Sequence, residues 1–265
     1  MIETFVYIFV FITGTVVGSF VNVCAYRIPR GISVIKPRSS CPSCGAALKA
    51  RELIPVVSYI FLRGRCAACH ARISILYPTT ELACGALWAA LFWKLGLTFQ
   101  FAVYAPLCSI FLAVLLVDLK WMRIPNALVL CALVPACAAI ANYSLIYTGP
   151  ERFRSVYNSA NAVEPLLGLI PGALFLLIYA VTAAFGGGRG AIGMGDIKLL
   201  IPIGLALGLR QCLFAAFIAV ILGGLVGAAL LITRVKSRKD PIPFGPFLVI
   251  GAIAAIFLPV SILFI

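Results

Sequence analysis

Two aspartates at the edges of apolar segments are the residues of this chain best placed to do chemistry. Asp118 closes the apolar run 109–118, and Asp196 ends the segment GMGD (193–196) where another apolar run begins. The chain has only eight acidic residues, and a carboxylate at membrane depth is costly and usually functional. The pair therefore indicates acid–base chemistry inside a bilayer.

A carboxylate pair of this kind can hydrolyse a bond with water. Two neighbouring carboxylates rarely ionise together, so one retains a proton. The ionised group can take a proton from water while the protonated group polarises the scissile carbonyl. As an alternative, Asp118 would pair with Lys120 or Arg123. Asp196 would then pair with Lys198, and both aspartates would only anchor helices at the interface.

The remaining residue types exclude several other catalytic classes. His70 is the only histidine and lies next to Cys69. Hydrolases that combine serine or cysteine with histidine, and multi-histidine metal sites of the HExxH kind, are therefore excluded. The sequence also lacks the GxxxxGK[ST] motif of nucleotide hydrolases. Carboxylate chemistry is what remains.

The elements that must position these aspartates are membrane helices. Apolar residues make up 63% of the chain, charged residues 11%, and the mean hydropathy is +1.12, whereas a soluble domain carries about 25% charged residues. The composition predicts an all-α polytopic membrane protein with about eight transmembrane helices. The expected segments are 5–23, 78–97, 100–119, 125–147, 164–186, 196–209, 211–232 and 244–264.

The positive charges predict an orientation for these helices. Of the 21 Lys and Arg residues, 17 fall on the side that holds 24–77 if the N-terminus is outside. Such an excess marks the cytoplasmic side, so both aspartates are expected there. The first helix has no basic start and is expected to be retained. A net charge of +13 could suit nucleic acid, but this one-sided distribution argues against such a partner and makes the charge mainly topological. The basic side also suits anionic lipid headgroups.

Four cysteines predict a metal site in the one sizeable polar segment. Cys41 and Cys44 form one CxxC pair, Cys66 and Cys69 form another, and 21 residues separate the inner cysteines. This spacing is typical of a tetrahedral structural zinc, which would stabilise a segment too small for a large core. The alternatives are free or redox-active thiols, or His70 as a substitute ligand.

These features divide the chain into three expected parts. They are a first transmembrane helix (1–23), a cytoplasmic zinc domain (24–77) and a transmembrane domain that holds the aspartates (78–265). A polar outer loop is expected at 148–163, and a glycine-rich hinge is expected at 186–195.

An ordered set of motifs resembles the type IV prepilin peptidases, a branch of the GxGD intramembrane aspartyl proteases. The GMGD segment resembles the GxGD motif of that family, and the two CxxC pairs resemble its cytoplasmic zinc module. The other matching segments are GSFVN (18–22), YRIP (26–29), YPTTEL (77–82), IPN (124–126) and PFGPF (243–247).

The resemblance implies a bifunctional enzyme of the bacterial inner membrane, with Asp118 and Asp196 as its catalytic pair. Such an enzyme cleaves the basic leader of prepilins or pseudopilins at the cytoplasmic face. It then methylates the new N-terminus with S-adenosylmethionine. Leu76 replaces an arginine that is frequent before the Tyr-Pro of the family, so a peptidase without methyl transfer is one alternative. A non-enzymatic membrane scaffold or transporter is another.

Five further residues are candidates for supporting or substrate-binding roles. Glu81 would serve substrate or methyl transfer, or pair with an arginine or cap a helix. Asn22 would bond a neighbouring helix or line the substrate groove. Lys198 would reach to the interface or contact substrate. Gly193 and Gly195 would allow the close backbone approach that substrate needs.

Overall fold

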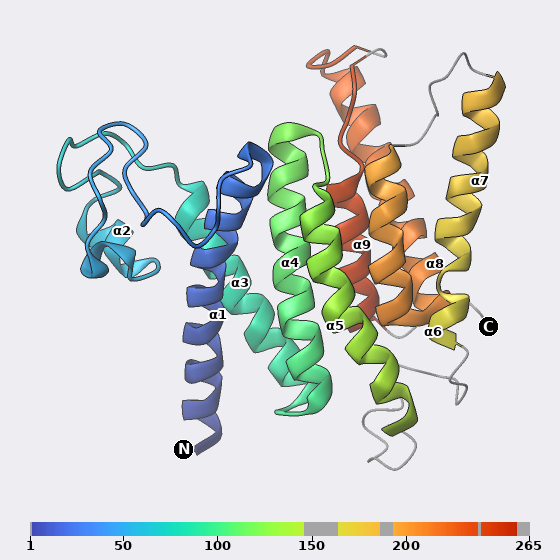
Figure 1. Cartoon of the computed structure of the whole chain (residues 1–265), viewed down its shortest axis with the longest axis horizontal. Helices are drawn as coiled ribbons and strands as arrows, with labels where there is room; N and C mark the ends of the chain where they lie inside the picture. Colours follow the sequence, from blue (N-terminus) through green and yellow to red (C-terminus); the bar gives the residue numbers. More distant parts are fainter. Residues whose placement is uncertain (1, 146–163, 186–192, 238–239, 259–265) are drawn as a thin grey trace. The chain divides into compact units, whose positions relative to one another are not determined.

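The computed structural model describes residues 2–145, 164–185, 193–237 and 240–258. The predicted loop 148–163 and most of the predicted hinge 186–195 lie outside these residues. Within them, the chain is mostly helical (Figure 1), apart from the long segment 28–56, which includes two 3-10 turns, and the other connections. Two isolated β-bridges join Ser40 to Ala47 and Arg65 to Arg72. The helices are α1 (Ile2–Arg27), α2 (Val57–Phe61), α3 (Leu76–Leu95), α4 (Phe99–Trp121), α5 (Asn126–Leu145), α6 (Glu164–Leu167), α7 (Ile170–Phe185), α8 (Met194–Ile232) and α9 (Gly245–Phe257).

The lengths and composition of these helices identify a multi-pass membrane protein. Four described segments are long and apolar enough to cross a bilayer: Ile2–Arg30, Phe99–Trp121, Pro165–Ala184 and Met194–Ile232. Two shorter apolar helices are Asn126–Ile140 and Gly245–Phe257. The prediction of an all-α membrane protein is confirmed for the described residues. Helix α3 covers most of the predicted span 78–97 but is not among the four, so eight crossings stay a prediction.

The chain forms two compact units that divide inside α4. The first ends at Ala113, and the second begins at Val114. The first unit contains α1, α2, α3 and the beginning of α4. The second contains the end of α4 and all the later helices.

In the first unit, α1 and α3 pack closely through glycines. A Cβ atom on Gly18 would lie 2.8 Å from the Cα atom of Glu81, and one on Gly14 would lie 2.9 Å from the Cα atom of Gly85. Gly14 and Gly18 form a GxxxG pair, which lets two membrane helices approach until their backbones touch. The side chain of Asn22 adds a hydrogen bond from its Nδ2 to the carbonyl oxygen of Tyr77, at 3.1 Å.

In the second unit, α8 is interrupted at Gly208. This residue has φ 80° and ψ 176°, a conformation that only glycine adopts without strain. The predicted division between 196–209 and 211–232 therefore lies at Gly208. Both ends of α8 lie toward the same end of the unit, so the chain reverses at this break (Figure 1).

Glycines also bring the two segments of α8 against their neighbours. Gly204 touches the backbone of Gly168, just after α6, and Gly251 of α9 touches the backbone of Ala215. The first segment of α8, which begins beside Asp196, is thereby held against the turn between α6 and α7. The second segment is held against α9.

Candidate active site and candidate metal centre

Asp118 lies in the last turn of α4 and is only 5% exposed. Its Oδ2 accepts a hydrogen bond of 3.1 Å from the backbone N–H of Gly245, at the start of α9. The helix ends soon after this residue, where Met122 has a positive φ of 49°. Asp118 is therefore a buried carboxylate that a backbone donor holds from a distant part of the sequence.

Asp196 lies in the first turn of α8 and is half-buried. Its N–H bonds the carbonyl oxygen of Gly193 at 3.1 Å, and a Cβ atom on Gly193 would lie 2.8 Å from its Oδ2. Asp118 and Asp196 lie close enough for their charges to interact. The second unit thus brings together two acidic residues that are far apart in the sequence.

Ile124 lies between the GMGD segment, which carries Asp196, and the start of α9, which holds Asp118 through the N–H of Gly245. A Cβ atom on Gly195 would lie 3.2 Å from the Cβ of Ile124, and one on Gly245 would lie 3.2 Å from its Cδ1. Sequence reasoning did not assign a role to Ile124 or Gly245. The signal that could have found Gly245 is its place in PFGPF, where a glycine stands between two bulky residues at a helix start.

The interfacial ion pairs considered as an alternative are not formed among the residues that the structure describes. Neither aspartate pairs with Lys120, Arg123 or Lys198 there. The Nζ of Lys198 instead donates a hydrogen bond of 3.1 Å to Oδ1 of Asn126, which begins α5. Lys198 therefore connects the start of α8 to the start of α5.

Glu81 and Asn22 belong to the first unit, whereas both aspartates belong to the second. Glu81 is 7% exposed, and its Oε2 accepts a hydrogen bond of 2.7 Å from the backbone N–H of Val56. Val56 has a φ of 61°, which is a costly conformation for a β-branched residue. Glu81 thus ties α3 to the residue that precedes α2, a contact that the sequence did not predict.

The four predicted metal ligands converge in the first unit. The Sγ atoms of Cys41, Cys44, Cys66 and Cys69 all lie within 4.8 Å of one another, and those of Cys41 and Cys69 are 3.9 Å apart. Tetrahedral zinc with Zn–S bonds of about 2.3 Å needs sulfur atoms about 3.8 Å apart. The cluster therefore fits a zinc ion.

The two CxxC pairs form two turns of the same design. The N–H of Cys41 bonds the carbonyl oxygen of Ala46, and the N–H of Cys66 bonds that of Ala71, both at 2.9 Å. After the second cysteine of each pair the chain takes a positive φ, 74° at Gly45 and 57° at His70. His70 occupies the position of Gly45 and is not a member of the four-residue cluster. The turn therefore accounts for the position of His70, and no role as a metal ligand is needed.

Comparison with known proteins shows the family. Residues 12–95 match the bacterial peptidase A24 N-terminal domain, and residues 105–228 match the type IV leader peptidase family. A prepilin leader peptidase/N-methyltransferase of Bacillus subtilis is 35% identical over 245 residues, which cover 92% of this chain and 91% of that protein. The chain belongs to the type IV leader peptidase family.

Other members of the type IV leader peptidase family match over a similar length. A protein of the same description from Pseudomonas putida is 32% identical, with 92% of this chain and 88% of that protein covered. One from Pseudomonas aeruginosa is 30% identical, with 90% and 85% covered. No solved structure has significant similarity to the chain.

Proposed function

We propose that this protein is a prepilin leader peptidase and N-methyltransferase whose proteolytic pair is Asp118 and Asp196. The main support for the peptidase activity is that two carboxylates approach each other within one unit: Asp118 at the end of α4 and Asp196 at the start of α8. Membership of the leader peptidase family supports the substrate class, a prepilin or pseudopilin. The names of the relatives support the second activity.

In the proposed cleavage, a water molecule lies between the two carboxyl groups. The ionised carboxylate, here called the first aspartate, takes a proton from this water. The oxygen of the water then attacks the scissile carbonyl carbon. The protonated carboxyl donates a hydrogen bond and then its proton to the carbonyl oxygen. The tetrahedral intermediate collapses as the C–N bond breaks: the leaving amine receives a proton from the first aspartate, and one hydroxyl of the intermediate returns a proton to the second. The carbonyl group is thereby re-formed, and the pair regains its starting protonation.

Residues around the pair would position it for this reaction. The N–H of Gly245 holds one oxygen of Asp118. Gly193 lets the chain pass close to the carboxylate of Asp196, and Gly195 packs against Ile124. The two glycines would thereby keep the first turn of α8 close to its neighbours and leave the carboxylate of Asp196 in position for substrate. Lys198, bonded to Asn126, would keep the first turn of α8 in place. These are supporting roles rather than bond-making ones.

The four-cysteine cluster would hold a structural zinc ion within the segment 24–77. Four thiolates fill the tetrahedral coordination of zinc and leave no position for substrate or water. The metal would therefore stabilise the fold of the segment, and the peptidase reaction does not pass through it. In this proposal the segments 1–23 and 78–265 are the first membrane helix and the peptidase domain.

The proposed methyl donor is S-adenosylmethionine, which the description of the relatives as N-methyltransferases implies. Its chemistry is transfer of an activated methyl group to the new N-terminal amine. In the part of the chain that the structure describes, we assign no residue to its binding.

The proposed location is the bacterial inner membrane, with the N-terminus outside. The lysine and arginine excess around 24–77 and 234–239 supports a cytoplasmic position for the zinc segment and the aspartates. Eight crossings would satisfy this orientation, with α8 contributing one crossing before Gly208 and one after it.

Mass spectrometry of a prepilin incubated with the purified protein tests both activities. We expect loss of the leader without cofactor, and one added methyl group when S-adenosylmethionine is present. Asp118→Asn and Asp196→Asn should each lower cleavage by about 10⁴-fold, because one carboxylate cannot replace the other. Full cleavage by either variant would remove the proposed pair.

The same measurement separates the alternatives. Leader loss without methylation, in a protein with its zinc bound, would indicate a peptidase that has lost methyl transfer, as the leucine at position 76 allows. If several prepilins remain intact with folded, zinc-loaded protein, the scaffold or transporter interpretation replaces the enzyme.

A further inference from the structure

Helix α2 presents an apolar face that nothing in the first unit covers. Val57, Ile60 and Phe61 are 44%, 67% and 82% exposed, and their spacing places them on one side of the helix. Ser58 and Tyr59 lie on the opposite side and are half-buried. The hydroxyl of Tyr59 is 3.5 Å from the carbonyl oxygen of Ile73. The helix is therefore amphipathic, but its apolar side faces outward.

Two further exposed apolar residues lie next to this helix. Leu53 ends the short 3-10 turn beside α2, Ile54 follows it, and they are 44% and 49% exposed. We call Leu53, Ile54, Val57, Ile60 and Phe61 the α2 patch. Exposed apolar residues gathered in this way mark a contact with another protein or with a membrane.

Contacts within the first unit set the level of the α2 patch along the membrane helices. The residue before α2, Val56, is bonded to Glu81, which lies five residues into α3. At 1.5 Å per residue, that is about 7.5 Å from the start of α3. Figure 1 shows α2 level with the first turns of α3. In the predicted topology, in which a span begins at residue 78, the α2 patch therefore lies level with the cytoplasmic end of that span.

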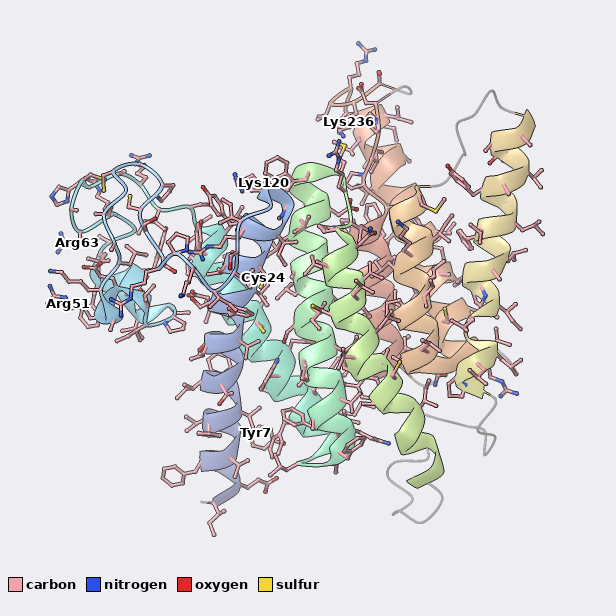
Figure 2. All side chains as sticks on the ribbon, in the orientation of Figure 1. Tyr7, Cys24, Arg51, Arg63, Lys120 and Lys236 are labelled. Atoms are coloured by element: carbon pink, nitrogen blue, oxygen red, sulfur yellow. The ribbon has the colours of Figure 1, made fainter. Side chains whose placement is uncertain are left out.

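The charges around the α2 patch indicate what kind of partner it binds. Residues 24–77 contain nine Lys and Arg residues and a single acidic residue, Glu52. Arg51 and Arg63, on either side of the patch in the sequence, are exposed and point outward from this part of the unit (Figure 2). An apolar face with basic flanks at the interface is the pattern that binds anionic lipid headgroups and the acyl chains beneath them.

We propose that the α2 patch inserts into the cytoplasmic leaflet of an anionic bilayer, with Arg51 and Arg63 on lipid phosphates. The zinc segment is then attached to the membrane by its own surface as well as by α1 and α3. A basic leader peptide would be repelled by the same arginines, which favours lipid over prepilin as the partner. Lipid phosphates would also neutralise the segment and reduce its repulsion of a basic leader.

Photo-crosslinking of the full-length protein in nanodiscs tests this proposal. The photoreactive residue p-benzoylphenylalanine replaces Phe61 in one sample and Ile35 in the other. Ile35 is a matched position because it is 83% exposed and belongs to the same basic segment, but it lies outside the α2 patch. The nanodiscs contain phosphatidylcholine alone or phosphatidylcholine with phosphatidylglycerol.

We expect phospholipid adducts at position 61, several-fold more of them with phosphatidylglycerol, and few at position 35. Equal yields at the two positions, or no lipid adduct at position 61, would overturn the proposal. Replacement of the lipid adduct by a prepilin adduct when prepilin is added would also overturn it and assign the patch to substrate.

A charge substitution gives a second test that does not depend on crosslinking. In nanodiscs with phosphatidylglycerol, hydrogen exchange at residues 53–61 should be slow, and Phe61→Asp should accelerate it several-fold. Ile35→Asp changes the net charge equally and should leave this exchange unchanged. Retained zinc in both variants shows that the segment is folded. Unchanged exchange in Phe61→Asp would contradict insertion of the patch.

Discussion

At the scale of single residues, the glycine in PFGPF explains how a buried carboxylate is held. The N–H of Gly245 donates to Asp118, and a side chain at the same position would collide with the carboxylate that it holds. Gly245 therefore combines a hydrogen-bond donor with the absence of a Cβ atom. A glycine can meet both requirements where any other residue would displace Asp118.

Gly245→Ala should lower the turnover of prepilin cleavage by about 100-fold, because a displacement near 1 Å can cost that much in a positioned site. The new Cβ atom would lie 2.6 Å from Oδ2 of Asp118. Gly224→Ala is the matched control, since a Cβ atom there meets nothing within 4 Å. Equal activity of the two variants would show that the Gly245 contact does not matter for cleavage.

Glu81 illustrates a carboxylate whose observed contact is with the backbone. Glu81→Gln retains an oxygen that can accept the hydrogen bond from Val56, whereas Glu81→Leu leaves that partly buried N–H without its acceptor. We expect Glu81→Leu to lower the free energy of unfolding by about 1–3 kcal/mol and Glu81→Gln to lower it less. Thermal unfolding measures this difference. Equal losses in stability would mean that the charge of Glu81, rather than its hydrogen bond, matters.

At the scale of elements, the two cysteine turns show one local design used twice. Each turn places two thiols beside the shared centre and then passes through a left-handed residue, Gly45 in one and His70 in the other. The left-handed conformation costs more free energy for a histidine than for a glycine, which has no Cβ atom. Cys69 therefore serves as a candidate metal ligand, whereas the next residue, His70, only forms the turn.

Metal content distinguishes these roles. Cys41→Ser should release the zinc and increase hydrogen exchange throughout 24–77, because the metal holds the two turns together. His70→Gly should retain the metal and leave the segment at least as stable, since glycine suits the positive φ at this position. Zinc stoichiometry by elemental analysis is the measurement. Loss of zinc from His70→Gly would contradict this assignment and show that His70 binds the metal.

At the scale of the whole molecule, the distribution of charge sets the expected orientation in the membrane. The segment 24–77 is strongly basic, and Arg51, Arg63 and Arg65 are exposed on its surface. Both aspartates lie at helix ends that the predicted topology places on the same side. The location of this segment therefore decides on which side of the membrane a substrate leader must be.

Trypsin added to intact spheroplasts should leave the segment 24–77 uncut, and trypsin added to inverted membrane vesicles should cut it at exposed arginines away from the α2 patch, such as Arg38 and Arg72. The reason is that the positive-inside rule places these arginines in the cytoplasm. Fragment masses give the sites of cutting. Cutting in intact spheroplasts would reverse the orientation and move the proposed active site to the outer face.

Composition and local spacing were sufficient for much of the fold and for part of the site. Apolar runs of about 20 residues predicted the membrane helices, because a bilayer requires that length whatever the neighbours. The CxxC spacing predicted which four thiols converge, because each turn is local. The two aspartates stood out because charged residues are rare in such segments.

Long-range packing decided the rest, because it depends on which backbones touch in three dimensions. Nothing near Asp118 in the sequence shows that its oxygen will meet the N–H of Gly245, which comes 127 residues later. The bond between Glu81 and Val56 likewise follows from a tertiary contact. Residue types and spacing determined which groups can react and bind metal, while only the tertiary structure decided what holds each group in place.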